Sequence, residues 1–308
     1  MAVNPLTVSL GPLELRTPVL ASSGTWGYGT EQSYFSSYPE LGAFMTKGIT
    51  LRPREGNPPP RLYETRAGLL NSVGLENVGL EKFLLEKLPA LPSDHPPVLV
   101  NIAGETVEEY VQLANALSKE NEVAGLEVNV SCPNKDNGMA FGTDPNLVAD
   151  LTEAVRSACP KKVLVVKLTP NVTDISPIAQ AAARSGADAL SMINTLVGCA
   201  IDRTRKGPVF HRVYAGLSGP AVKPVALAAV WRVYECLSGE VPLIGMGGIQ
   251  TWEDALEFVL AGATAVSIGT ANFVDPLCCV KVVSGLRSYL ETERVASIQD
   301  LVGQAHDR

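Results

Sequence analysis

Gly125-Leu-Glu-Val-Asn-Val130 is a short apolar run rich in branched residues, and Val163-Leu-Val-Val-Lys-Leu168 is a second run of the same kind. Between them, Asp144-Pro-Asn-Leu-Val-Ala-Asp-Leu151 opens with a capping signal and has the apolar spacing of an amphipathic helix. Runs that are apolar on both faces are typical of parallel strands covered by helices on both sides. This part of the sequence therefore predicts a strand, a crossover helix and a second, parallel strand.

The same alternation extends over the rest of the chain. Amphipathic segments with capping signals lie between most of the apolar runs, for example at residues 105–114, 174–183 and 251–258. The eight predicted strands are residues 17–21, 43–49, 98–102, 125–130, 163–168, 189–195, 242–247 and 264–270. Eight such strands with intervening helices favour a closed (β/α)8 TIM barrel over an open sheet.

Three segments extend beyond the simple alternation. Residues 7–15 predict a β-hairpin that turns at Gly11-Pro12 and closes the floor of the barrel. Residues 50–75 and 196–221 are too long for simple crossovers. We expect both to extend over the carboxyl ends of the strands and to act as walls or a lid there.

Composition limits the kinds of partner. Residues 1–308 are expected to form one domain, because a barrel reaches this length with insertions and no linker divides the sequence. The net charge is −7 and the 25 lysines and arginines are scattered, which argues against nucleic acid or a membrane surface as partner. We expect no signal peptide and no membrane span. The six cysteines and three histidines lack the spacing of disulfide frameworks, zinc sites or iron–sulfur clusters, so we expect a cytoplasmic protein without a metal site.

The carboxyl ends of the predicted strands carry amides, lysines and glycines. In barrel enzymes these ends form the active site. Lysine or asparagine at five successive strands is hard to assign to packing, because each side chain would be buried without polar partners. We therefore expect these residues to bind a polar, flat ligand. In chain order they are Ser22 and Ser23, Lys47 and Gly48, Asn101, Asn129, Lys167, Asn194 and Thr195, Gly247 and Gly248, and Gly269 and Thr270.

A cysteine follows the fourth predicted strand, in Asn129-Val-Ser-Cys132-Pro-Asn134. Pro133 disfavours a helical conformation at Cys132 and cannot donate to a sheet, so the strand should end here with the thiol facing a cavity. A thiol is a workable base where its surroundings favour the thiolate. Asn129 and Asn134 could offer donors and acceptors to a planar heterocycle. The alternative is a buried structural cysteine behind a Pro-Asn turn.

Glycines at the last two strands suggest a phosphate site. Gly247-Gly248 and Gly269-Thr270 lie where barrels commonly bind phosphate through backbone N–H groups, which predicts a phosphorylated cofactor. Their alternative role is tight-turn chemistry. Lys47 and Lys167 could lie beside a flavin ring or its ribityl chain and stabilise the reduced flavin, although either alone could be a solvated charge.

The chain resembles the class 1 dihydroorotate dehydrogenases over nearly its whole length. Ten segments carry the resemblance in order and spacing: Ala21-Ser-Ser-Gly-Thr, Thr46-Lys-Gly-Ile-Thr, Asn71-Ser-Val-Gly-Leu-Glu-Asn77, Val100-Asn-Ile-Ala-Gly, Asn129-Val-Ser-Cys-Pro-Asn134, Val166-Lys-Leu-Thr-Pro-Asn, Ile193-Asn-Thr, Gly216-Leu-Ser-Gly-Pro-Ala-Val-Lys-Pro, Gly245-Met-Gly-Gly-Ile and Ile268-Gly-Thr. One departure is residues 210–216, where relatives tend to have a smaller, glycine-rich stretch.

The resemblance implies a reaction and a set of site residues. In that family a thiolate removes the C5 proton of dihydroorotate while the C6 hydride passes to N5 of FMN, which gives orotate for de novo UMP synthesis. Cys132 matches the base, and Lys47 is the other expected catalytic residue. The implied FMN contacts are Ser23, Lys47, Gly48, Asn101, Asn129, Lys167, Ile193, Gly219, Gly247, Gly248, Gly269 and Thr270. The implied substrate contacts are Lys47, Asn71, Ser72, Val73, Gly74, Leu75, Asn129, Asn134, Asn194 and Thr195.

The resemblance also implies an electron acceptor. With cysteine at the position of the base, the chain resembles class 1. The membrane-associated class 2 enzymes carry serine at that position and also have an N-terminal extension. Residues 134–142 and 74–80 look more like the NAD-linked class 1B group than the fumarate-reducing class 1A group. Class 1B implies a partner subunit that carries FAD and a 2Fe-2S cluster and passes electrons to NAD, in a heterotetramer built around a dimer of catalytic chains.

Two functions of other kinds stay open at this point. An FMN-dependent dihydropyrimidine dehydrogenase would share the cysteine loop but would have no reason to bind a carboxylate. A phosphate-binding aldolase or isomerase that forms a Schiff base on Lys167 would be colourless and trappable by borohydride.

Overall fold

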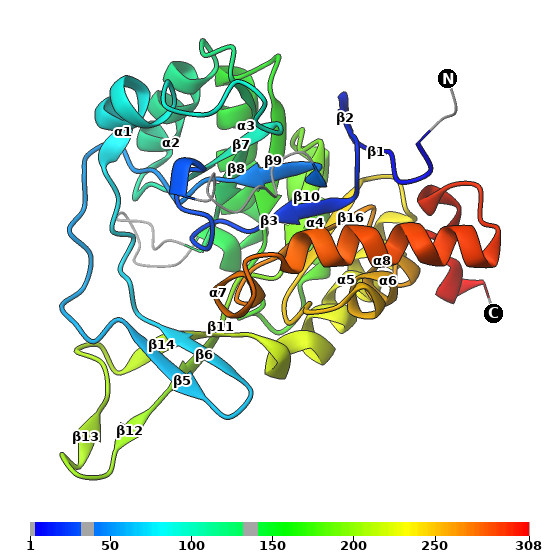
Figure 1. Ribbon diagram of the computed structural model, residues 1–308. Helices are drawn as coiled ribbons and strands as arrows, with labels where there is room; N and C mark the ends of the chain where they lie inside the picture. The colour runs from blue at the N-terminus through cyan, green and yellow to red at the C-terminus, as the bar shows by residue number, and fades with distance from the viewer. Residues whose placement is uncertain (1–3, 32–39, 132–140, 308) are drawn as a thin grey trace.

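The computed structural model describes residues 4–31, 40–131 and 141–307, and its centre is a closed barrel of eight parallel strands (Figure 1). The strands run round the barrel in the order β10-β15-β16-β3-β4-β7-β8-β9. Their bounds are β3 Val19–Ala21, β4 Ala43–Met45, β7 Val98–Ile102, β8 Val123–Asn129, β9 Val163–Lys167, β10 Ala189–Met192, β15 Leu243–Met246 and β16 Ala265–Ile268. Each of the eight predicted strands is confirmed, and so is the (β/α)8 barrel.

Helices cover the outside of the barrel, which explains why the strands are apolar on both faces. Every residue of β7, β9, β10, β15 and β16 is buried. The longer helices are α2 Val107–Leu117, α3 Pro145–Ala158, α4 Ser176–Arg184, α5 Lys223–Leu237, α6 Trp252–Leu260 and α8 Cys278–Glu293. The short ones are α1 Gly79–Lys82, which continues as the π-helix η3 Phe83–Lys87, then η4 Phe141–Thr143, η5 Pro220–Val222, α7 Ala271–Val274, η6 Ile298–Leu301 and η7 Gln304–His306.

The capping signals in the sequence correspond to real helix caps. The Thr106 hydroxyl accepts from the Glu109 N–H before α2, and the Asp144 carboxylate accepts from two N–H groups before α3. Thr251 and Asp254 form a capping box at α6. Local sequence therefore fixes where these helices begin, and the barrel then buries their apolar faces.

The predicted hairpin is present at the floor of the barrel. β1 (Val8–Leu10) pairs with β2 (Leu13–Leu15), and Gly11 takes the left-handed φ of 55° that the tight turn requires. Val8, Leu10 and Leu15 are fully buried. A Cβ atom on Gly11 would lie 2.8 Å from the Cβ of Asp188, which precedes β10. The hairpin therefore lies at the amino ends of the strands, opposite the site described below.

The two long connections pair with each other. β5 (Leu62–Thr65) and β6 (Gly68–Asn71) of the first join β11 (Leu196–Cys199) and β14 (Tyr214–Ser218) of the second in one antiparallel sheet, ordered β11-β14-β6-β5. Beyond it, β12 (Ile201–Asp202) pairs with β13 (Gly207–Pro208). Figure 1 shows this sheet projecting from the barrel at lower left. Phe210, from the departing stretch 210–216, is buried with Leu70 in a small second core.

Within the described ranges, no helix has both the length and the apolar character needed to cross a lipid bilayer. The single domain over residues 1–308 stays a prediction.

Candidate active site

A cavity of about 1020 Å³ opens at the carboxyl ends of the strands, and the two long connections form part of its wall. Among the described residues, it brings together every residue expected at the cofactor and every residue expected at the substrate except Ser72. Those lining it are Ser23, Lys47, Gly48, Asn71, Val73, Gly74, Leu75, Asn101, Asn129, Lys167, Ile193, Asn194, Thr195, Gly219, Gly247, Gly248, Gly269 and Thr270. Cys132 and Asn134 lie outside the described residues.

Ser72 connects the predicted substrate loop to Asn57. It is buried, and the Asn57 side-chain amide donates to both its carbonyl oxygen and its hydroxyl at 3.1 Å. Next to it, Gly74 has a φ of 75° and Leu75 a φ of 56°, an uncommon value for a residue with a side chain. Residues 71–75 therefore form a tightly shaped loop, and substrate contact by Ser72 stays a prediction.

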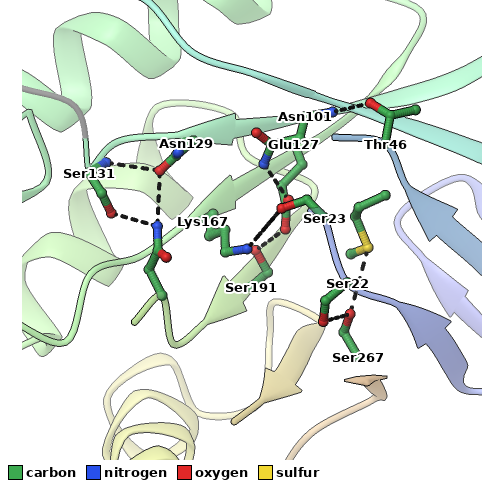
Figure 2. Close-up of polar contacts among 12 residues, drawn as sticks. Ser22, Ser23, Thr46, Asn101, Glu127, Asn129, Ser131, Lys167, Ser191 and Ser267 are labelled. Carbon is green, nitrogen blue, oxygen red and sulfur yellow. Dashed lines mark hydrogen bonds and ion pairs between the residues drawn. The ribbon is translucent and has the colours of Figure 1, made fainter. Parts of the chain in front are cut away.

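A buried carboxylate, Glu127 on β8, lies below the cavity and was not among the expected site residues. It accepts from Asn101 Nδ2 at 2.6 Å through one oxygen and from Ser191 Oγ at 2.8 Å through the other. Lys167 Nζ lies 3.8 Å from the first oxygen. Figure 2 shows these side chains converging from neighbouring strands. The signal in the sequence is a lone carboxylate inside the apolar run 123–130, since a buried charge needs partners.

The amides beside the cysteine loop are fixed by one another. Asn194 Nδ2 donates to Asn129 Oδ1 at 3.1 Å and to Ser131 Oγ at 2.8 Å. Asn129 Oδ1 also accepts from the Ser131 N–H at 3.2 Å. Because both lone pairs of that oxygen are used within the protein, Asn129 can offer only its N–H groups to a ligand. The protein therefore fixes Asn129 as a hydrogen-bond donor of the expected pyrimidine site before any ligand binds.

The opposite wall is made of backbone rather than side chains. Gly247 and Gly248 have φ values of 129° and 78°, which side-chain-bearing residues rarely adopt. A Cβ on Gly248 would lie 2.8 Å from the Cβ of Lys223. Two residues that line the cavity are also joined here, because Thr270 Oγ1 donates to Ser218 Oγ at 2.8 Å. This wall can bring backbone N–H groups close to an anion such as a phosphate.

Lys47 shares a carboxylate at the edge of the substrate loop. Its Nζ donates to Glu76 Oε2 at 3.0 Å, and Arg61 Nη1 donates to the same oxygen at 3.2 Å. The Glu76 side chain is 44% exposed, so the pair lies near solvent. Sequence analysis missed Glu76, because nothing in the local pattern separates it from an ordinary surface glutamate.

The five cysteines that the structure describes are poor candidates for the base. Burial raises the pKa of Cys278 to about 11 and also raises the pKa of Cys159, Cys236 and Cys279. Cys199 is exposed on β11, and none of these five lines the cavity. None of these five is therefore a candidate for the base, and the assignment of that role to Cys132 stays a prediction.

The cavity fits a flat, phosphorylated cofactor. Its volume is in the range of pockets for cofactor-sized ligands. Lys167 and Asn101 offer a cation and an amide from one side. The wall formed by Gly247, Gly248, Gly269 and Thr270, here called the glycine wall, allows close approach to the backbone from the other side. Among the described residues, no cluster of histidine, cysteine and carboxylate side chains is placed to hold a metal ion.

Comparison with known proteins decides the family. The family model described as dihydroorotate dehydrogenase matches residues 5–290. The chain belongs to the dihydroorotate dehydrogenase family. A protein of Geotalea daltonii named "dihydroorotate dehydrogenase B (NAD(+)), catalytic subunit" is 50% identical over 304 residues, covering 98% of this chain and 99% of its own. A protein of the same name from Pelobacter propionicus is 52% identical over 299 residues, covering 97% of each chain.

A solved dihydroorotate dehydrogenase shares the fold. The crystal structure of the Eimeria tenella enzyme with ferulenol matches with a TM-score of 0.82, over 99% of this chain and 89% of its own, at 23% identity. At that identity the match concerns the barrel architecture alone. Dihydroorotate dehydrogenases are flavoproteins that depend on FMN, and the cavity at the strand ends has the volume and the donors to hold one.

Proposed function

We propose that this chain is the catalytic subunit of an NAD-linked, class 1B dihydroorotate dehydrogenase, which oxidises dihydroorotate to orotate in pyrimidine biosynthesis. The observation that carries the proposal is the near full-length match, at about half identity, to relatives named as such catalytic subunits. The cavity supports it independently, because its donors suit a flavin and a pyrimidine carboxylate. Supplied with dihydroorotate, the chain should reduce its own flavin.

In this proposal the wall around Gly247 and Gly248 would hold the phosphate of FMN, and the wall that carries Asn101 and Lys167 would hold its ring. Gly219, Gly247, Gly248, Gly269 and Thr270 would contact the phosphate end. The ring and the ribityl chain would contact Ser23, Lys47, Gly48, Asn101, Asn129, Lys167 and Ile193. When bound, FMN supplies the hydride acceptor.

The proposed substrate lies between the flavin and the loop of residues 71–75. Asn129, Asn134, Asn194 and Thr195 would match the N–H and C=O edges of the dihydropyrimidine, and Lys47 would contact its carboxylate. Cys132, as thiolate, would take the C5 proton while the C6 hydride leaves. The step would leave orotate and a protonated thiol, and the hydride and its two electrons would pass to the FMN that these residues hold.

Reoxidation of the flavin is assigned to a second subunit. The relatives' name, "catalytic subunit", supports a separate partner. By the class 1B resemblance, that partner would carry FAD and a 2Fe-2S cluster and pass electrons to NAD, in a cytoplasmic heterotetramer around a dimer of this chain. Without the partner, the chain should reduce dyes or oxygen but not NAD at a useful rate.

A two-step assay tests the proposal. The flavin released from the purified chain by denaturation should be FMN, and dihydroorotate should bleach the bound flavin. FAD, or no flavin after reconstitution with excess FMN, would contradict the cofactor. NAD reduction should require the co-expressed partner. Efficient fumarate reduction would move the chain to class 1A, and reduction of uracil rather than orotate in the reverse direction would make it another dihydropyrimidine dehydrogenase.

A further inference from the structure

Four neighbouring strands each place one polar side chain in a single buried layer at the base of the cavity. The residues are Asn101 of β7, Glu127 of β8, Lys167 of β9 and Ser191 of β10, and each is at most 6% exposed. Glu127 is fully buried, and both of its oxygens accept hydrogen bonds, from Asn101 at 2.6 Å and from Ser191 at 2.8 Å (Figure 2). This donor set suits a carboxylate, which only accepts.

Glu127 determines which end of the Asn101 amide faces the cavity. Because Asn101 Nδ2 is committed to Glu127, its Oδ1 is the end that points toward Gly48. A Cβ on Gly48, which lines the cavity, would lie 2.9 Å from that oxygen. A flipped amide would set its oxygen against the carboxylate, which has no hydrogen to donate. Asn101 is therefore locked as a hydrogen-bond acceptor toward the ligand.

Glu127 also balances the lysine of this layer. Lys167 Nζ lies 3.8 Å from Glu127 Oε2 and donates to Ser23 Oγ at 3.3 Å. Lys167, Ser23 and Asn101 line the cavity, whereas Glu127 is not among the lining residues. At 6% exposure, a lysine without a nearby anion would be costly to keep charged. Glu127 therefore acts on a ligand through its neighbours.

We propose that Glu127 is a positioning residue that sets the polarity of the flavin site. It turns Asn101 into an acceptor, holds Lys167 as an adjacent donor, and offsets the positive charge of Lys167 beneath the flavin. The proposal rests on the function proposed above. These two side chains would then suit a ligand edge that offers an N–H group to Asn101 and an acceptor atom to Lys167. It also follows that the bound flavin is harder to reduce than it would be beside an uncompensated lysine.

The first test is the midpoint potential of the bound FMN in the holoenzyme with Glu127→Gln. Glutamine can still accept from Asn101 and can donate to the Ser191 oxygen, so the variant removes the charge and keeps the hydrogen bonds. The potential should shift to a more positive value. The matched control is Asp188→Asn, which removes an ion-pair carboxylate 2.8 Å from Arg156 at the barrel floor and should leave the potential unchanged.

A second test needs no flavin. Unfolding of the apoprotein by denaturant is measured for Glu127→Gln, Lys167→Met and the double variant. The double variant should lose less free energy of unfolding than the two single variants lose together, because it leaves no unpaired buried charge. If Glu127→Gln alone is too unstable to bind flavin, the double variant should still fold, because it lacks the unpaired charge.

The outcomes separate this proposal from the proposed function. A chain that binds no FMN, or whose FMN dihydroorotate does not reduce, contradicts the proposed function itself. If the wild-type holoenzyme is normal, two results would overturn the role of Glu127 alone. One is an unchanged potential in Glu127→Gln, and the other is a strictly additive loss of stability in the double variant. A shift of equal size in Asp188→Asn would also overturn it.

Discussion

The two halves of the barrel mouth offer different groups to a ligand. Strands β7 to β10 carry Asn101, Asn129, Lys167 and Asn194 at or just after their ends, so that half offers side chains to a ligand. Strands β15 and β16 are followed by Gly247-Gly248 and Gly269-Thr270, so that half offers backbone. The difference suits a ligand with a hydrogen-bonding ring at one end and a phosphate at the other. Substitutions in the first half should change chemistry, and those in the second should change retention of the cofactor.

The largest effect is expected at Cys132, which follows β8 in the sequence. Cys132→Ala should slow flavin reduction by dihydroorotate about 10²- to 10⁴-fold, the usual cost of losing a general base. FMN content and orotate binding should stay normal, because the glycine wall is untouched. Stopped-flow absorbance measures the reduction, with Cys199→Ala, an exposed thiol on β11, as the control. Reduction at a near-normal rate would show that Cys132 is structural.

The backbone half is tested by Gly248→Val. The left-handed φ of 78° costs a side-chain-bearing residue about 1–2 kcal/mol, and the Lys223 contact adds crowding. The dissociation constant of FMN should rise by about tenfold or more, as measured by flavin fluorescence. With FMN in excess, reduction by dihydroorotate should be near normal. Gly207→Val is the control, because a Cβ atom there would lie no closer than 3.9 Å to its nearest neighbour, the Arg205 carbonyl oxygen, and its φ is not left-handed. Loss of rate with full flavin occupancy would contradict the division of roles.

A smaller effect is expected from Lys223, which holds the glycine wall from outside. Its Nζ donates to Asp254 and to Glu257, and Asp254 in turn accepts from the N–H groups of Gln250 and Thr251. Lys223→Met should lower the free energy of unfolding by about 1–2 kcal/mol, since charged hydrogen bonds are lost from a partly exposed site. Denaturant unfolding measures the loss, and Lys281→Met, an exposed ion pair, is the control.

The Lys223 contribution should depend on pH at both extremes. Burial alone would lower the pKa of Lys223, but its bonds to Asp254 and Glu257 outweigh burial and raise it. Burial would raise the pKa of Asp254, but bonds from Lys223 and the backbone lower it. The difference between wild type and Lys223→Met should therefore be constant from about pH 5 to about pH 9. It should shrink as the pH falls through the lowered pKa of Asp254 or rises through the raised pKa of Lys223. A difference that peaks at either extreme would contradict this pairing.

The smallest effect concerns Lys47, which lies at the edge of the substrate loop. Glu76→Gln removes the carboxylate that occupies Lys47 at 3.0 Å and should free it for the substrate carboxylate. Because the pair is exposed, the gain is about 0.2–1 kcal/mol, or up to about fivefold tighter dihydroorotate binding at low salt. Flavin absorbance during titration reports the affinity, and Glu64→Gln, also at the cavity wall, is the control. Weaker binding would instead make Glu76 a support for Lys47.

Much of the site could be inferred from residue type and strand position. Asn101, Lys167 and Gly248 were expected at the cavity because each ends a predicted strand, and all three line it. Glu127 and Glu76 were missed for different reasons. Glu127 lies inside a strand, where the apolar pattern of the sequence indicates the strand and its burial but does not single out one polar residue as functional. Glu76 acquires its role only through Lys47 and Arg61, which are distant in sequence.

The sequence by itself determined the eight strands, the capped helices and the family. Apolar runs and capping residues act over a few neighbours, so their effect can be read locally. Tertiary structure alone decided that residues 62–71 and 196–218 pair in one sheet, and that one carboxylate orients Asn101 while balancing Lys167. These features depend on closing the barrel, which brings side chains from separate strands within hydrogen-bonding distance.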